Sequence, residues 1–319
     1  MPEAVAAVRT TCPYCGVGCG LLVSRAAGGV DWSVRGDPAH PANLGRLCSK
    51  GAALAETLSL DDRLLHPLVD GRHASWESAL DTVAGRFARV VVEHGPDAVA
   101  FYVSGQLLTE DYYVANKLMK GFIGSANIDT NSRLCMASAV AGHKRAFGSD
   151  SVPGCYEDLE LADLVVLVGS NAAWTHPVVY QRLAAAKKAR PAMRVVAIDP
   201  RRTATADLAD LGLAIRPGGD AWLFNGLLQY MKKEDAIDWR YLEAHVEGFG
   251  AALEAVAGLS IPVVSAHCGL AEHDVAELYR LFAATPKTVT LFSQGINQSS
   301  SGVDKVNSIL NVHLATGRI

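Results

Sequence analysis

Four cysteines within the first 50 residues have the spacing of metal-ligating thiols. Cys12, Cys15 and Cys19 form a C-x2-C-x3-C run, and Cys48 follows alone in a Leu-Cys-Ser-Lys-Gly segment. The glycines inside the run let the backbone curl so that its sulfurs converge on one point. A structural zinc site with four cysteines usually has two separated C-x2-C pairs. The spacing therefore favours a cubane 4Fe-4S cluster, with zinc as the alternative.

A fifth cysteine, Cys135, lies in an Asn-Ser-Arg-Leu-Cys-Met segment. Asn131 or Ser132 can cap a helix that begins here, which predicts that Cys135 lies in the first turn. Amide dipoles and the charge of Arg133 would favour a thiolate there, and a thiolate is a good metal ligand. The alternative is an ordinary buried cysteine in an Ala-rich helix. The two other cysteines have no such context and are predicted to be structural: Cys155 and Cys268.

Short apolar runs that end in polar or glycine-rich turns predict a parallel sheet. The runs span 164–168, 194–198 and 211–215, and helical patterns over 179–189 and 221–232 separate them. This alternation is typical of βαβ units. Ligands of such sheets bind at the carboxyl ends of the strands. The candidate residues at these ends are Gly169, Ser170, Asn171, Asp199, Pro200, Arg201, Gly218, Gly219 and Asp220.

The side chains at these strand ends suit a nucleotide. Asp199 can accept hydrogen bonds from ribose hydroxyls, Arg201 can pair with phosphate, and Asp220 can accept from the N1-H and the exocyclic amine of guanine. Taken singly, each segment is a weak signal, because such residues after a strand more often form an ordinary turn or helix start. The sequence has neither a G-x-G-x-x-G at a strand-to-helix turn nor a P-loop. A bound dinucleotide would therefore be held in another way.

The remaining sequence indicates a globular α/β protein. The first 60 residues or so predict a small cluster domain of short strands with a turn at Gly28-Gly29, and helical spacing begins at Trp76, before a strand over 97–103.

The formal net charge is -4 and no lysine or arginine tract occurs, which argues against nucleic-acid and membrane partners. The N-terminal segment has no secretory pattern, and seven cysteines exclude a complete disulfide framework. We therefore expect a cytoplasmic protein.

In their order along the chain, these motifs resemble those of molybdopterin oxidoreductases that carry bis-molybdopterin guanine dinucleotide. The resemblance includes Gln-Gly-Ile-Asn-Gln at 294–298 and covers essentially the whole chain. Within that family, segments 105–113 and 131–140 are most similar to the catalytic subunit of bacterial assimilatory nitrate reductases. Formate dehydrogenases, the alternative among enzymes, usually have histidine after the metal-ligating residue, where this chain has Met136.

The resemblance implies a role for each motif. The first three cysteines and Cys48 would ligate the cluster, Lys50 would lie on the electron path from cluster to pterin, and Cys135 would ligate molybdenum. Gln106 and Asn131 would contact the pterin near the metal. The segments that would hold the pterin and nucleotide portions are 168–175, 199–203, 218–220, Gln294 and Gln298.

The resemblance also implies an activity and a domain plan. Nitrate would be reduced to nitrite by oxygen-atom transfer, with electrons from ferredoxin, flavodoxin or an NADH-linked subunit, and Arg133 would help to attract the anion.

The implied domain plan has four segments. They are a cluster domain over 1–60, the first part of an α/β domain over 61–130, a nucleotide-binding α/β domain over 131–290, and a return over 291–319 into the α/β domain that begins at 61. Family members are longer, so we expect an N-terminal part with an incomplete cofactor cage. A non-catalytic iron-sulfur electron carrier is a further alternative.

Overall fold

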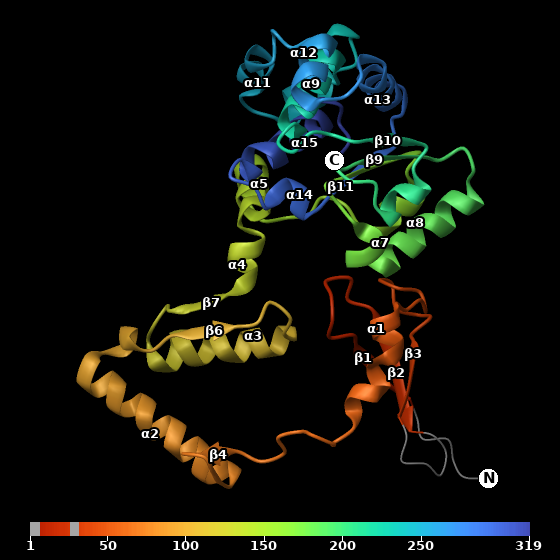
Figure 1. Cartoon of the computed structure of the whole chain (residues 1–319). Coiled ribbons are helices and arrows are strands. Elements are labelled where there is room, and N and C mark those ends of the chain that lie inside the picture. The colour runs from red at the N-terminus through yellow and green to blue at the C-terminus, as the bar shows by residue number, and fades with distance from the viewer. Residues whose placement is uncertain (1–6, 26–31) are drawn as a thin grey trace, which may run out of the picture. The chain divides into compact units, whose positions relative to one another are not determined.

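The computed structural model describes residues 7–25 and 32–319, and the turn predicted at Gly28-Gly29 lies outside them. The chain forms two compact units, Met1–Cys135 and Met136–Ile319, and each is described by itself. The predicted class is confirmed: short strands at the N-terminus are followed by α/β structure with parallel strands (Figure 1). In the described part of the chain, no helix is both long and apolar enough to cross a membrane.

The first unit begins with a three-stranded antiparallel sheet whose strand order is β1-β2-β3. The strands are β1 Val8–Thr11, β2 Gly20–Arg25 and β3 Trp32–Gly36. Asn43 is fully buried and holds the start of β2, since its Oδ1 accepts from Gly20 N at 2.8 Å and its Nδ2 donates to Gly20 O at 3.0 Å. The short helices α1 Ser49–Ala52 and η1 Ala53–Leu58 follow. The short strands predicted for the N-terminal region are therefore present.

The rest of the first unit contains one long helix and a two-stranded parallel sheet. Ser75 caps the helix α2 Trp76–His94 by accepting from Ser78 N at 3.2 Å. The Phe87 ring of α2 lies 6.1 Å from the Phe101 ring of the sheet. The strand expected over 97–103 is shorter, because the turn at Pro96 forms a 3-10 helix first. The elements are β4 Leu68–Val69, β5 Arg72–His73, η2 Pro96–Ala98, β6 Phe101–Val103, α3 Thr109–Asn116, η3 Lys117–Ile123, β7 Ile128–Thr130 and α4 Asn131–Cys135.

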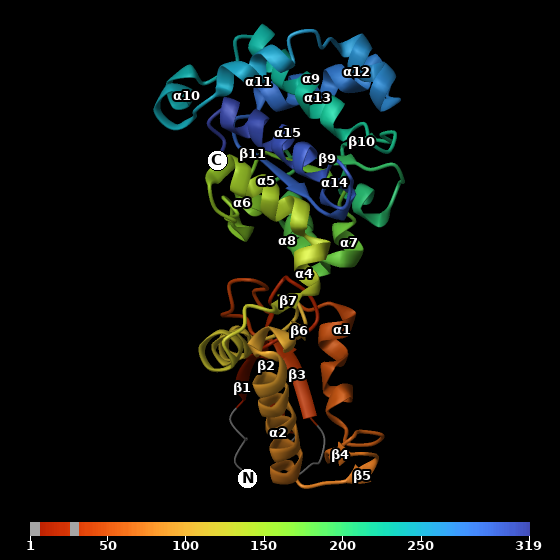
Figure 2. The same ribbon diagram turned by 90° about the vertical axis from the view of Figure 1, so that its left-hand side faces the viewer.

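The second unit is built around a four-stranded parallel sheet of order β10-β9-β8-β11. All five residues of β8 are buried, as expected for a central parallel strand covered on both faces. Figure 2 shows α9 and α13 on one side of the sheet and α8 on the other. The strands are β8 Leu164–Val168, β9 Arg194–Ile198, β10 Leu211–Leu213 and β11 Thr288–Phe292.

Two of the three strands predicted for this sheet have the observed bounds. The third, β10, stops at Leu213 because Ile215 N turns back to Leu213 O at 3.0 Å. The sequence analysis missed β11, although its Thr-Val-Thr-Leu-Phe segment is rich in β-branched residues. The helices are α5 Ala137–Phe147, α6 Tyr156–Leu161, α7 Ala172–Thr175, α8 Pro177–Ala189, η4 Ala204–Leu208, α9 Asp220–Lys233, α10 Trp239–His245, α11 Phe249–Ala255, α12 Ile261–Cys268, α13 Glu272–Ala284, α14 Gln294–Asn297 and α15 Gly302–Ala315.

A glycine allows α9 to pack closely on its neighbours. A Cβ on Gly226 would lie 2.4 Å from Val264 of α12 and 2.5 Å from the Tyr279 hydroxyl of α13. That hydroxyl donates to Leu223 O at 2.6 Å. Any side chain at position 226 would therefore displace a buried hydrogen bond.

Replacing Gly226 with alanine should lower the free energy of unfolding by about 1–3 kcal/mol, because the extra methyl group overpacks a full core. Gly250 of α11 is the matched control, since a Cβ there meets nothing within 4 Å. Gly250→Ala should leave stability unchanged or raise it by up to about 1 kcal/mol. Urea unfolding of both variants measures the difference. Equal stability of the two variants would contradict the packing described.

Candidate functional site

The four predicted cluster cysteines all belong to the first unit. Cys12 directly follows β1, Cys19 directly precedes β2, and Cys15 lies on the turn between them. Cys12 N donates to Cys19 O at 2.8 Å, and Gly18 N donates to Cys15 O at 3.3 Å. Gly18 has a φ of +69°, a left-handed conformation that favours glycine. Cys48 precedes α1 as its N-cap residue.

The thiols act on one another electrostatically. The pKa of Cys19 is raised to about 11, mainly by burial and to a smaller extent by Cys12, Cys15 and Cys48. Burial likewise raises the pKa of Cys12, and its neighbours Cys15 and Cys48 add to this, whereas Lys50 lowers it. Four thiolates are therefore unfavourable here without positive charge between them, which bound iron would supply. Binding would also release the thiol protons.

The cysteine spacing favours a cluster over one zinc ion. Three of the four thiols come from one C-x2-C-x3-C run and the fourth precedes α1, whereas a structural zinc site with four cysteines usually has two separated C-x2-C pairs. In a cubane cluster each thiolate bonds a different iron. The four cysteines therefore stay the predicted ligands of a 4Fe-4S cluster.

Cys15→Ser should abolish the broad visible absorption of the anaerobically purified chain, because it removes one of four thiolate ligands. Iron and sulfide analysis with an absorption spectrum makes the measurement. Cys155→Ser is the control, since Cys155 is exposed and lies in the second unit, and it should leave the spectrum intact. Stoichiometric zinc without iron or sulfide in the unmutated chain would contradict the cluster.

The two residues predicted to contact the pterin and the lysine predicted to lie on the electron path all belong to the first unit. Asn131 is the first residue of α4, and its Oδ1 accepts from Gly105 N at 2.6 Å. Gln106 Nε2 donates to the backbone carbonyl of Tyr14. Lys50 Nζ lies 5.9 Å from the centroid of the Tyr14 ring. The sequence analysis did not single out Tyr14, although it stands inside the first cysteine motif.

The position of Cys135 differs from the predicted one. The helix α4 begins at Asn131 itself and ends at Cys135, so the prediction of Cys135 in the first turn is wrong. The reason is that β7 runs directly into α4, and the Asn131 side chain is bonded to Gly105 instead of capping a helix. Met136 interrupts the helix with φ -112° and ψ 11° before α5 begins. Ligation of molybdenum by Cys135 stays a prediction.

Arg133 is not a free positive charge. Its Nε is paired with Oδ2 of Asp129, which lies four residues earlier in β7. The pKa of Asp129 is lowered, first by the backbone N–H of Thr130 and then by Arg133. The carboxylate therefore offsets the charge that the sequence analysis expected to attract an anion.

In the second unit, two glycines make backbone contact where neighbouring strands end. Gly169 follows β8, and Gly295 lies just beyond β11 in α14. Gly295 N donates to Gly169 O at 3.0 Å. A Cβ on Gly295 would lie 2.6 Å from the Gly169 Cα, and one on Gly169 would lie 2.8 Å from the Gly295 Cα. Because β9 pairs with the other side of β8, this contact marks the topological switch point of the sheet.

The predicted nucleotide residues of three segments lie at this same edge of the sheet. Asn171 Oδ1 accepts from Thr205 Oγ1 at 2.9 Å, which ties the end of β8 to η4. Asp199 Oδ1 accepts from Arg201 N at 2.9 Å in the turn after β9. The residues that follow the carboxyl ends of β8, β9 and β11 are Gly169, Ser170, Asn171, Asp199, Pro200, Arg201, Gln294 and Gln298. Their contacts with a cofactor stay predictions.

The Gly218–Asp220 segment leads from β10 into α9. Gly218 has a φ of +91°, and Asp220 is the first residue of the helix. Asp220 Oδ2 lies 2.8 Å from Lys305 Nζ of α15, with side chains only 9% and 5% exposed. Lys305 was not among the residues predicted from the sequence. The available signal was its position on the apolar stripe of α15, four residues before the buried Ile309.

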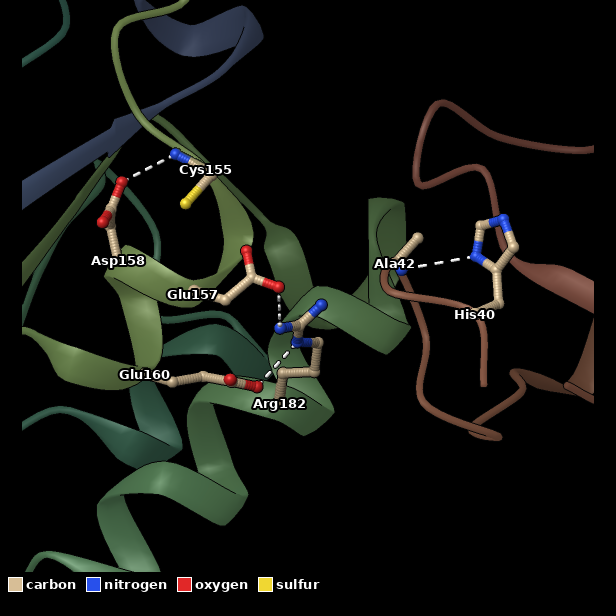
Figure 3. Close-up of polar contacts among 7 residues, drawn as sticks. All are labelled: His40, Ala42, Cys155, Glu157, Asp158, Glu160 and Arg182. Atoms are coloured by element: carbon tan, nitrogen blue, oxygen red, sulfur yellow. Dashed lines mark hydrogen bonds and ion pairs between the residues drawn. The ribbon is translucent and has the colours of Figure 1, made fainter. Parts of the chain in front are cut away.

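The second unit also contains a buried arginine and two cysteines that were predicted to be structural. The buried Arg182 of α8 lies 2.7 Å from Glu160 and 3.6 Å from Glu157, both on α6 (Figure 3). Cys155, predicted to be structural, is exposed just before α6, and its backbone N donates to Asp158 Oδ2 at 2.7 Å. Cys268, predicted to be structural as well, is fully buried, and its thiol donates to Gly219 O at 3.2 Å.

Comparisons with known proteins agree with these features. Residues 5–59 match the model of the molybdopterin oxidoreductase Fe4S4 domain, and residues 63–319 match that of molybdopterin oxidoreductase. The chain is 59% identical to a nitrate reductase of Klebsiella oxytoca over 97% of its length, and 49% identical to one of Shewanella frigidimarina over 98%. The fold is similar to acetylene hydratase from Pelobacter acetylenicus, with a TM-score of 0.85 over 98% of the chain at 21% identity.

The chain is shorter than these proteins. It spans 35% of the Klebsiella protein and 34% of the Shewanella protein, and it covers 43% of the acetylene hydratase chain.

Proposed function

The chain belongs to the molybdopterin oxidoreductase family, and we propose that the protein reduces nitrate to nitrite with electrons that pass through a 4Fe-4S cluster. The observation that carries the proposal is the similarity, over nearly the whole chain, to two proteins named nitrate reductase. The four thiols of the first unit and the glycine contact of the second are the features that would hold the two cofactors.

Different residues would hold the cluster and the molybdenum-pterin group. Cys12, Cys15, Cys19 and Cys48 would ligate the cluster, and Cys135 would supply a thiolate to molybdenum. The molybdenum-pterin group, when bound, supplies the oxygen-atom transfer. Gln106 and Asn131 are predicted to contact the pterin near the metal, and they would orient it by hydrogen bonds.

The nucleotide portions would lie along the carboxyl edge of the parallel sheet. Gly169 and Gly295 let the two backbones meet at the switch point of the sheet, and ligands of such sheets bind beside this point. Asp199 would accept from ribose hydroxyls and Arg201 would pair with phosphate. We propose the guanine dinucleotide form of the pterin on these grounds, with Asp220 as the acceptor for the base.

The physiological setting is proposed from the motifs. We propose an assimilatory enzyme of the cytoplasm, and this part of the proposal is supported only by the resemblance of segments 105–113 and 131–140 to that type. Its electron donor would be ferredoxin, flavodoxin or an NADH-linked subunit. Lys50, which lies close enough to lower the pKa of Cys12, would be on the path from the cluster to the pterin.

Two other functions would give different measurements. A formate dehydrogenase would reduce a dye with formate, and Met136 in place of histidine argues against it. An iron-sulfur electron carrier would contain iron without molybdenum. Metal analysis and the two substrates therefore separate all three functions.

In the natural protein that carries this sequence, Cys135→Ala should lower nitrate reduction by more than about 100-fold. Loss of the ligand should cost more than the loss of a group that only supports a ligand, which costs about 10- to 100-fold. Nitrite formation with an artificial electron donor is the measurement, and the cluster absorption should stay unchanged.

The matched control is Cys155→Ala, at an exposed position, which should retain activity. Full nitrate reduction by Cys135→Ala would remove Cys135 from the site. Dye reduction with formate by the unmutated protein would refute nitrate reduction as the function.

A further inference from the structure

Tyr14 contacts several groups of the predicted electron path at once. It stands between Cys12 and Cys15, and its ring centroid lies 5.9 Å from Lys50 Nζ, within the range of a cation–π interaction. Its backbone carbonyl accepts from Gln106 Nε2. Its backbone N–H is hydrogen-bonded to the Cys12 thiol, which lowers the pKa of Cys12 against the larger effect of burial. One residue thus connects a predicted cluster ligand, the predicted electron-path lysine and a predicted pterin contact.

The contact with the Tyr14 ring restricts the positions that the Lys50 ammonium can take. Its side chain is exposed, and a lysine ammonium on a flexible four-carbon stem has many positions available. Within the described residues, no carboxylate lies within 4.0 Å of Lys50 to form an ion pair. The face of the Tyr14 ring is the interaction that restricts the ammonium.

We propose that Tyr14 is a positioning residue whose ring holds the Lys50 ammonium beside the cluster and thereby raises the cluster's reduction potential. The inference rests on the 4Fe-4S cluster of the proposed function. Reduction adds one electron to the cluster, so a nearby positive charge stabilises the reduced form more than the oxidised form. The effect falls with distance, so a displaced ammonium makes reduction harder.

The test is a redox titration of the cluster in the anaerobically purified 319-residue chain. Tyr14→Phe keeps the ring face and should leave the midpoint potential near that of the unmutated chain. Tyr14→Leu should shift it to a more negative value, in the same direction as Lys50→Met and by no more than that variant. In the Lys50→Met background, Tyr14→Leu should add no further shift, because the charge that the ring holds is already absent.

An isosteric comparison keeps the test valid if Tyr14→Leu fails to assemble a cluster. Pentafluorophenylalanine at position 14 has nearly the shape of phenylalanine but lacks the negative ring face that attracts a cation. It should shift the potential to a more negative value than Tyr14→Phe, and only when Lys50 is present. Both residues leave the backbone N–H to Cys12 in place, so a merely structural role would not separate them.

Two results overturn the inference. Equal potentials of the phenylalanine and pentafluorophenylalanine chains would show that the ring face does not hold the charge. Additive shifts from Tyr14→Leu and Lys50→Met would show that the two residues act independently. Absence of iron and sulfide from the unmutated chain would instead refute the cluster itself, so failure of the proposed function is recognised separately.

Discussion

The backbones of Gly169 and Gly295 touch where β8 and β11 end, and neither position has room for a Cβ. The hydrogen bond from Gly295 N to Gly169 O continues the pairing of the two strands past their last residues. Beyond β8 the chain continues into α7, and beyond β11 it continues into α14. The predicted Gly169–Asn171 segment, Gln294 and Gln298 therefore depend on one contact for their positions.

In the first unit, the corresponding constraint is electrostatic. Burial and mutual repulsion both disfavour the thiolates that a metal needs. The fold therefore brings together groups that are unfavourable as neighbours until positive charge is bound, and Lys50 supplies part of that charge from outside the ligand set. This is the pattern expected of a site whose binding energy also stabilises the folded domain.

Local patterns in the sequence were sufficient for the parts of the fold that have strong local signals. The buried run of β8 and the helical spacing that begins at Trp76 each carry their own signal, and the structure contains the expected elements. Cys135 was misplaced because the hydrogen bond of Asn131 to Gly105 joins residues 26 positions apart. A cap that is lost to such a distant partner cannot be seen in a local window of sequence.

The same limit applies to the choice among acidic residues at the strand ends. Asp199 and Asp220 were predicted from the sequence to have similar roles, since each is an acidic residue in the turn after a predicted strand. In the structure, Asp220 is paired with a buried lysine 85 positions later in the chain, whereas the Asp199 carboxylate accepts from the neighbouring Arg201 N. A carboxylate has room for several hydrogen bonds, so Asp199 keeps acceptor capacity for a ribose. Asp220 is held in place by Lys305, so a base that reached it would hydrogen-bond to a carboxylate that is already oriented and that keeps further acceptor capacity.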